Sequence, residues 1–175
     1  MSRKILAFAA SNSSVSINRQ LVEYAASLLE DAEIETLDIH EFEMPLYRHD
    51  REEESGIPQL AHDFRDRLAS ADALLIGLAE HNGHYPAAFK NLFDWCTRID
   101  RDVWQGKPMV LLATSGGPGG AGRVLDIAAT AAPVFGGDLR GTWSLPQFYD
   151  AFDMEAGELH NPEHVTALKD VLAKL

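Results

Sequence analysis

The stretch ALLIGL (residues 73–78) is a short, continuous run of apolar residues that leads directly into the turn-forming pair Asn82-Gly83. Continuous rather than alternating hydrophobicity is typical of a strand that is buried on both faces of a parallel sheet. The runs ILAFA (residues 5–9) and MVLLA (residues 109–113) have the same character. These segments therefore predict the central strands of a sheet that is covered on both sides.

Outward from this centre, strand and helix signals alternate along the whole chain. Weaker strand patterns lie at residues 34–39 and 138–143. Amphipathic segments predict helices over residues 18–29, 58–70, 86–99, 121–134 and 162–174, the last with Asn161 as its N-cap. Residues 40–56 are expected to be a long loop with a solvated acidic run at 52–54. Five strand–helix alternations predict a single α/β domain over residues 1–175, with a doubly wound five-stranded parallel sheet in three layers, α/β/α.

The composition restricts the class of partner. Lys and Arg number 15 against 27 Asp and Glu, so the formal charge is −12, and no basic run occurs. This balance argues against nucleic acid as a partner, because phosphates require clustered cations, and against an anionic membrane surface. The apolar run at residues 5–10 is too short for a signal peptide core, and no stretch approaches a membrane span. We therefore expect a cytoplasmic protein.

In a doubly wound sheet, ligands bind at the carboxyl ends of the strands. The first loop there, residues 10–18, combines serine hydroxyls with the free N–H groups of a helix start, which suits a phosphate. It lacks the Gly-Lys-Ser/Thr ending of a nucleoside-triphosphatase loop. The alternative is an ordinary helix cap with solvated serines.

The second loop, residues 79–86, is built around Asn82-Gly83, which favours a turn with positive φ. We expect it to present backbone amides and a flat imidazole to a ring. His81 and His84 have an H-x-x-H spacing, but without a third clustered ligand no metal site is predicted.

The third loop, residues 114–123, is rich in glycine, so its backbone can lie close to a flat group. Gly117, Gly119 and Gly122 match G-x-G-x-x-G by position, but a dinucleotide fingerprint follows a first strand and this loop follows the fourth. A flexible surface loop is the alternative.

Nucleophilic chemistry has little support in the sequence. There is no G-x-S-x-G elbow. Cys96, the one cysteine, can form neither an internal disulfide nor a thiolate metal site, and its position in the middle of a predicted helix indicates packing. No catalytic side chain is predicted.

The same loops carry a family resemblance. Residues 10–21 are similar to a motif G-S-x-R-x-x-S-x-N-x-x-L. A second motif, P-E-Y-N-x-x-x-P-x-x-x-K-N-x-x-D-W, is matched in register by Glu80, Asn82, Pro86, Lys90, Asn91, Asp94 and Trp95. Ser115, the glycine run and Arg123 form a looser third match. On these residues the chain resembles NAD(P)H-dependent FMN reductases, relatives of flavodoxin that include quinone, azo-dye and chromate reductases. The resemblance runs from the first strand to the helix after the fourth.

This resemblance implies a flavodoxin-like fold and a bound FMN, with NAD(P)H as co-substrate. The residues implied at the phosphate are Ser11, Ser13, Ser16, Ile17 and Asn18. Those implied around the isoalloxazine are Glu80, His81, Asn82 and Gly83 on one edge and Ser115, Gly116 and Gly117 on the other. The chain departs from the family pattern at four positions: Ala10 replaces glycine, Ser13 arginine, Ala79 proline and His81 tyrosine.

The implied reaction transfers a hydride from NAD(P)H through FMN to a small acceptor, which is a quinone, free flavin, azo compound or metal oxyanion. Two alternatives from other classes are a flavodoxin-like electron carrier and a non-redox domain that has lost its flavin. Fold alone does not distinguish them.

The predicted helix at 86–99 also suggests a homodimer or homotetramer, since relatives commonly pair through this helix. Phe89, Leu92, Phe93 and Cys96 are expected to cover the sheet, at helical spacing. Ala88, Trp95 and Ile99 extend the apolar stripe, so we expect a monomer to leave Trp95 in water. The alternative is that Trp95 packs internally under the loop at Trp104.

Overall fold

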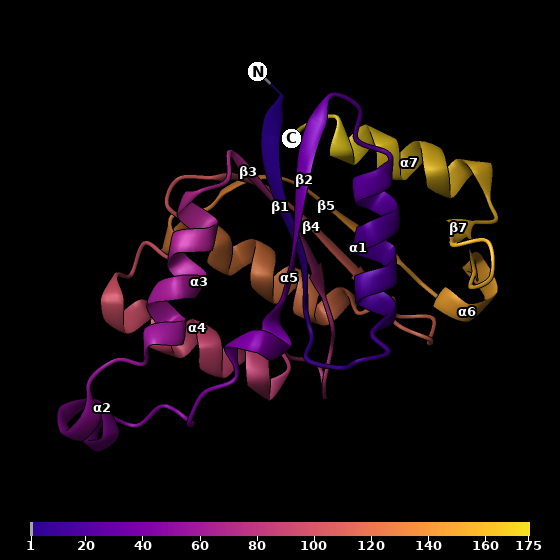
Figure 1. The fold of residues 1–175 in the computed structure, drawn as a ribbon. Helices are drawn as coiled ribbons and strands as arrows, with labels where there is room; N and C mark the ends of the chain where they lie inside the picture. The colour runs from indigo at the N-terminus through magenta and orange to yellow at the C-terminus, as the bar shows by residue number, and fades with distance from the viewer. Residues whose placement is uncertain (1) are drawn as a thin grey trace.

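The computed structural model describes residues 2–175, which form a five-stranded parallel sheet (Figure 1). The strand order is β2-β1-β3-β4-β5. The strands are β1 (Arg3–Ala10), β2 (Ala32–Asp38), β3 (Ala73–Leu78), β4 (Pro108–Thr114) and β5 (Asp138–Leu145). This confirms the doubly wound fold, with β1, β3 and β4 in the centre as their continuous hydrophobicity predicts.

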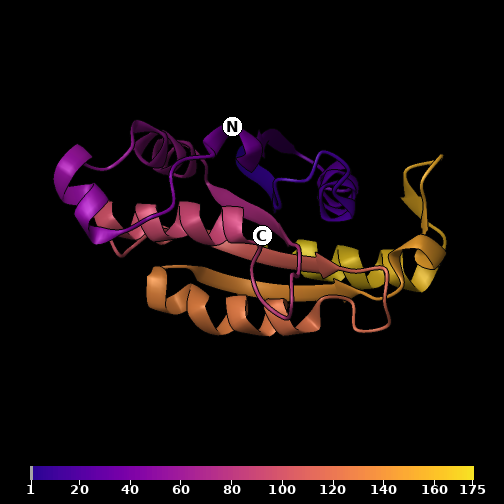
Figure 2. The same cartoon turned by 90° about the horizontal axis from the view of Figure 1, so that it is seen from below.

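Helices cover both faces of the sheet, which gives the three predicted layers (Figures 1 and 2). One face carries α3 (Gln59–Ala69), α4 (Ala87–Ile99) and α5 (Gly122–Ala131). The other carries α1 (Ile17–Ser27), α6 (Phe148–Ala151) and α7 (Pro162–Leu172). The cap at Asn161 is confirmed, because its side chain accepts a hydrogen bond from the backbone of Glu163.

Each central strand contributes alternate residues to two separate cores. On β3, Leu74, Ile76 and Leu78 face α3, α4 and α5, whereas Ala73 and Leu75 face α1 and α7. Both sets are apolar because both faces are covered, which explains why these strands read as unbroken hydrophobic runs.

Two secondary-structure predictions were wrong. Residues 40–56 are not a continuous loop, since they contain a 3₁₀ turn at Ile39–Phe42 and the helix α2 (His49–Ser55), which projects from the body of the protein (Figure 1). No residue of α2 is buried, so the sequence has no apolar periodicity to reveal it. The helix expected at 121–134 ends at Ala131 and continues as a 3₁₀ turn over Ala132–Phe135, where Pro133 removes a backbone donor.

A short hairpin of β6 (Phe152–Asp153) and β7 (Glu158–Leu159) was also not predicted. Its strands have two residues each, which is too short for a recognisable alternation of polar and apolar residues.

The expectation that a monomer leaves Trp95 in water was wrong. Its side chain is fully buried, its indole Nε1 donates to the carbonyl of Pro45 at 2.7 Å, and its ring packs edge-on against Tyr47. Asn91 accepts from the backbone N–H of Tyr47 at 2.8 Å and donates to the carbonyl of Met44 at 3.0 Å. The segment that covers Trp95 is therefore residues 44–47, and not the loop at Trp104.

The acidic run at 52–54 is also only partly solvated. The carboxylate of Glu52 accepts from Arg98 of α4 at 2.8 Å and from the hydroxyl of Tyr47 at 3.2 Å. Glu53 and Glu54 are exposed as expected. The contacts of Glu52 hold α2 to α4, since no apolar side chain does so.

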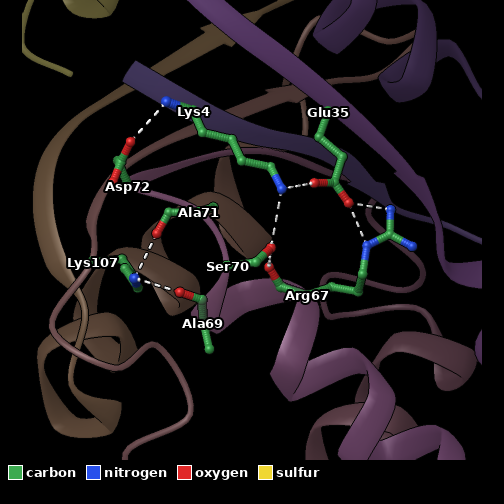
Figure 3. Close-up of polar contacts among 8 residues, drawn as sticks. All are labelled: Lys4, Glu35, Arg67, Ala69, Ser70, Ala71, Asp72 and Lys107. Atoms are coloured by element: carbon green, nitrogen blue, oxygen red, sulfur yellow. Dashed lines mark hydrogen bonds and ion pairs between the residues drawn. The ribbon is translucent and has the colours of Figure 1, made fainter. Parts of the chain in front are cut away.

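At the opposite edge of the sheet from the strands' carboxyl ends, a polar network joins β1, β2 and α3 (Figure 3). The carboxylate of Glu35 binds Lys4 Nζ at 2.6 Å and the guanidinium of Arg67. Lys4 also contacts Ser70 through its ammonium and Asp72 through its backbone N–H. The hydrogen bond from Lys4, joined by that from Arg67, holds the pKa of Glu35 below its usual value against the opposing effect of burial.

We expect Glu35→Gln to lower the free energy of unfolding by about 1 kcal/mol at pH 7, because it removes a charge shared by two cations. The pKa of Glu35 is lowered in the folded state, so its contribution exists above the ordinary value of 4.5 and is lost as the pH falls through the folded pKa. Urea unfolding at several pH values measures this.

The exposed Glu33, on the same strand, provides the matched control. Glu33→Gln should change the stability by less than about 0.5 kcal/mol. A stability difference between wild type and Glu35→Gln that stays constant from pH 7 to pH 3 would contradict the assignment.

Candidate functional site

The loops that follow β1, β3 and β4 meet at the carboxyl edge of the sheet, because these strands are neighbours and parallel. They span residues 11–16, 79–86 and 115–121. All of the residues expected at a cofactor lie in these loops or in the first turn of α1. The order of the strands therefore brings together segments that lie between residue 11 and residue 121 of the sequence.

The packing of α1 on β3 is unusually close. A β-carbon on Gly77 would lie 2.5 Å from Cγ2 of Val22 and 2.9 Å from the carbonyl oxygen of Asn18. Any side chain at position 77 would therefore push α1 away from the sheet. This contact brings the start of α1 across β3 towards the end of β4.

From the first turn of α1, the side chain of Asn18 binds the end of β4. Its amide oxygen accepts from the backbone N–H of Thr114, and its amide nitrogen donates to the carbonyl of the same residue, both at 3.0 Å. The side chain is buried. The family resemblance places Asn18 at a phosphate, but in the structure its amide holds the first loop to the end of the fourth strand.

The serines of the first loop act as hydrogen-bond acceptors towards the backbone. Ser16 is the N-cap of α1, and its hydroxyl oxygen accepts from the N–H of Arg19 at 3.2 Å. Ser11 and Ser13 accept at 3.3 Å from the N–H groups of Ser13 and Val15. Since each hydroxyl is engaged as an acceptor, its proton remains available to an external acceptor oxygen.

The charge around the start of α1 favours an anion. The first turn carries no acidic residue, and Ile17 is its first helical position, where backbone N–H groups lack intrahelical partners. The guanidinium of Arg19 binds Asp38 at 2.7 Å and so neutralises the nearby carboxylate of β2. In a chain with a net charge of −12, this is a locally favourable place for a phosphate.

The second loop is a tight hairpin turn. The backbones of His81 and His84 exchange two hydrogen bonds of 2.9 and 3.1 Å. Between them, Asn82 and Gly83 both have positive φ, 55° and 81°, as a type I′ turn requires. His84 Nδ1 accepts from the N–H of Tyr85, and among residues 2–175 no group of three His, Cys, Asp or Glu side chains has an arrangement that could hold a metal ion.

Glu80 connects the second loop to the third. Its carboxylate accepts from the N–H of Val124 at 3.0 Å, which caps the first turn of α5. The left-handed Ala121 precedes this helix and offers no side-chain cap of its own. On the neighbouring turn, a β-carbon at Gly83 would lie 3.6 Å from Cδ of Arg123.

The glycine-rich loop is fixed by the segment that follows β5, so the alternative of a flexible surface loop has no support. The carbonyls of Ser115 and Gly117 accept from the N–H groups of Phe148 and Gln147, both at 3.0 Å. Gly120 has positive φ, and a β-carbon there would lie 2.3 Å from Ser144 Oγ. Gly117, by contrast, faces open space.

Sequence reasoning missed the contribution of α6 to this edge. A signal was present, since the fifth strand also ends here and is followed by the aromatic pair Phe148-Tyr149. A β-carbon on Gly116 would lie 3.0 Å from Cε2 of Tyr149, so the tyrosine ring covers this glycine.

Neither of the two groups with a large pKa shift, the buried Cys96 and the half-buried Tyr85, suits acid–base or nucleophilic chemistry. Burial raises the pKa of the Cys96 thiol to about 12, and Sγ contacts the carbonyl of Ala61. The predicted packing role of Cys96 is thereby confirmed. Burial also raises the pKa of Tyr85 to about 12, so its hydroxyl stays protonated at neutral pH.

Residues 3–150 match the model of the NADPH-dependent FMN reductase family, which covers most of the chain and all three loops. The chain belongs to this family. A 2-hydroxy-1,4-benzoquinone reductase from Burkholderia sp is 38% identical over 104 residues, 58% of this chain and 55% of that protein. An NADPH:quinone oxidoreductase from Arabidopsis thaliana is 29% identical over 98% of this chain and 89% of its own length.

A solved structure of a flavoenzyme has the same architecture. The flavoenzyme NAD(P)H:acceptor oxidoreductase FerB from Paracoccus denitrificans superposes with a TM-score of 0.76 at 26% identity, over 98% of this chain and 94% of that one. The flavodoxin-like fold expected from the sequence is confirmed.

We expect Asn18→Ala to lower the free energy of unfolding by about 1–3 kcal/mol, because it leaves the N–H and C=O of buried Thr114 without partners. Chemical denaturation measures the effect. Asn12 in the same loop makes one exposed hydrogen bond, to Glu43, so Asn12→Ala should change stability by less than about 0.5 kcal/mol. Equal effects of the two substitutions would mean that Asn18 is not the link between α1 and β4.

Proposed function

We propose that this protein is an FMN-dependent oxidoreductase that transfers reducing equivalents from NAD(P)H to a small acceptor of the quinone, flavin, azo or metal-oxyanion type. The observation that carries the proposal is the fixed meeting of the three loops with the family's motifs at the carboxyl edge of the sheet. The named relatives, which are quinone reductases and a flavoenzyme, support the class of reaction.

The donors of the first loop fit the FMN phosphate. Ser11, Ser13 and Ser16 would donate through their hydroxyls, and Ile17 and Asn18 through the backbone N–H groups of the first helical turn. No acidic residue of that turn opposes the phosphate.

The other two loops fit a flat ring system. The turn of Glu80, His81, Asn82 and Gly83 would border one edge of the isoalloxazine with backbone groups, and Ser115, Gly116 and Gly117 would border the other. The side chain of Glu80 acts indirectly, because its capping of α5 fixes the turn relative to the glycine-rich loop.

When bound, FMN would supply the redox chemistry that links nicotinamide oxidation to reduction of the acceptor. The chain itself binds and orients the rings, which is the larger part of what such a reaction requires of a protein. The protonated states of Cys96 and Tyr85 agree with a site that uses no protein nucleophile.

The function is tested by adding FMN to the purified protein, removing unbound flavin, and following NADH and NADPH oxidation with 1,4-benzoquinone. We expect flavin absorption bands on the protein and quinone-dependent oxidation of a nicotinamide. Bound flavin without nicotinamide oxidation would indicate an electron carrier. A protein that stays colourless would indicate a domain without flavin function.

We expect Ser16→Ala to weaken FMN binding tenfold or more while leaving riboflavin binding nearly unchanged, because only FMN carries a phosphate to accept from the hydroxyl. Flavin fluorescence titration measures both affinities. Ser14→Ala, an exposed serine of the same loop, is the control and should bind FMN like the wild type. Equal losses for FMN and riboflavin would remove Ser16 from the phosphate site.

We further propose that the protein is a homodimer through α4 and α5. Between these helices lies a cavity of about 370 Å³, whose wall includes Phe89, Phe93 and Phe135. Phe93 is half-buried: it packs against the core on this face of the sheet, as expected, and its ring also packs edge-on against Phe135. Val134, 53% exposed, extends the apolar surface beyond the cavity. A second copy is the occupant that the family resemblance supports.

Val134→Glu should shift a dimer towards the 19.3 kDa of one chain, because it places a charge in the apolar contact. Sedimentation at micromolar concentration measures the mass. Met154→Glu, an equally exposed apolar residue between β6 and β7, should leave the dimer intact. A wild-type protein that sediments as a monomer would contradict the proposal.

Among residues 2–175, no helix combines the length and hydrophobicity that crossing a bilayer requires. The need for NAD(P)H supports a cytoplasmic location. We also infer that the chain forms one domain, since both cores of the described residues, 2–175, pack on the same sheet.

A further inference from the structure

Tyr149 is an aromatic residue that the proposed chemistry does not yet use. It lies in α6, directly after the fifth strand, and 64% of its surface is exposed. Its neighbour Phe148 is fully buried and stacks on Phe152 at 4.8 Å. Since Phe148 already provides the packing that anchors α6, the exposed ring of Tyr149 is not required for that purpose.

The position of Tyr149 is nevertheless tightly defined. The N–H groups of Gln147 and Phe148 donate to the carbonyls of Gly117 and Ser115. These bonds fix the start of α6, which follows β5, to the glycine-rich loop that follows β4. The Tyr149 ring lies against Gly116, where a β-carbon would approach Cε2 to 3.0 Å and Cδ2 to 3.3 Å. The absence of a side chain at Gly116 therefore allows the ring to pack in this position.

Two further features give Tyr149 the means to bind a ligand. Its hydroxyl has no hydrogen-bond partner within the described chain, residues 2–175, so it is free to donate. The ring contacts the same glycine whose backbone is proposed to border the isoalloxazine. A flat molecule that approaches the flavin from this side would meet an aromatic face and a free O–H donor together.

We propose that Tyr149 determines acceptor specificity by favouring flat, conjugated ring acceptors that carry carbonyl oxygens, namely quinones, over small inorganic oxidants. The ring packs against the quinone, and the hydroxyl donates to a quinone carbonyl. This proposal rests on the proposed function, because it places the acceptor next to the flavin. Tyr149 itself takes no part in electron transfer.

The direct test is binding without turnover. Oxidised, FMN-loaded protein is titrated with 1,4-naphthoquinone by calorimetry in the absence of NAD(P)H, so that no reaction occurs. We expect Tyr149→Ala to weaken naphthoquinone binding about tenfold and Tyr149→Phe about threefold, since phenylalanine keeps the ring and loses the hydroxyl. FMN affinity, measured by fluorescence, should stay within twofold of the wild type for both variants.

Turnover provides the second comparison. Tyr149→Ala should lower kcat/KM for naphthoquinone about tenfold while changing kcat/KM for ferricyanide, which has no aromatic ring, by less than twofold. Met154→Ala, the exposed apolar control between β6 and β7, should change neither.

The outcomes separate this proposal from the function on which it rests. A wild-type protein that binds no FMN overturns both. FMN-loaded Tyr149→Ala that binds naphthoquinone as the wild type does overturns only the role of Tyr149. A parallel loss of FMN affinity, or an equal loss with ferricyanide, also overturns it, because Tyr149 would then support the cofactor instead of selecting the acceptor.

Discussion

The two hydrogen bonds between the Asn18 amide and the backbone of Thr114 join the start of α1 to the end of β4, across the strand that lies between them. They form only because Gly77 lets α1 approach β3 without a side chain in between. The first loop, proposed to bind the phosphate, lies at one end of this connection, and the glycine-rich loop, proposed to border the ring, starts at the other. Without these two hydrogen bonds, the first and third loops would still lie at the same edge of the sheet, but the distance between them would not be fixed.

Further links extend from this connection. Glu80 caps α5 and so holds the second loop to the helix that follows the third. The backbone of α6 then holds the glycine-rich loop from the side of β5. The polar side chains of this edge mostly satisfy backbone groups, which agrees with a protein that positions a cofactor and leaves the chemistry to it.

Hydrophobic pattern predicted the sheet and its helices because burial on both faces leaves a strong signal in β1, β3 and β4. The pattern failed where elements depend on polar contacts. The helix α2 has no buried residue and is held through Glu52, so no apolar period marks it.

The motif around Asn91 and Trp95 was matched in sequence, but its local role was misjudged. These two side chains secure residues 44–47, and the cover over Trp95 comes from a segment about 50 residues away in sequence. Similarly, the family resemblance predicted a cofactor-binding role for Asn18 and Glu80 but could not reveal that their side chains bind the end of β4 and the first turn of α5, since those contacts depend on three-dimensional proximity.

The most direct test of this account is a crystal structure of the FMN complex. The phosphate should lie within hydrogen-bond distance of the Ser11 and Ser16 hydroxyls and the first N–H groups of α1. The isoalloxazine should lie between the turn at residues 80–83 and the loop at 115–117, with the Asn18–Thr114 pair intact. A flavin bound elsewhere, such as in the cavity between α4 and α5, or a complex in which Asn18 leaves Thr114 to contact the phosphate, would contradict it.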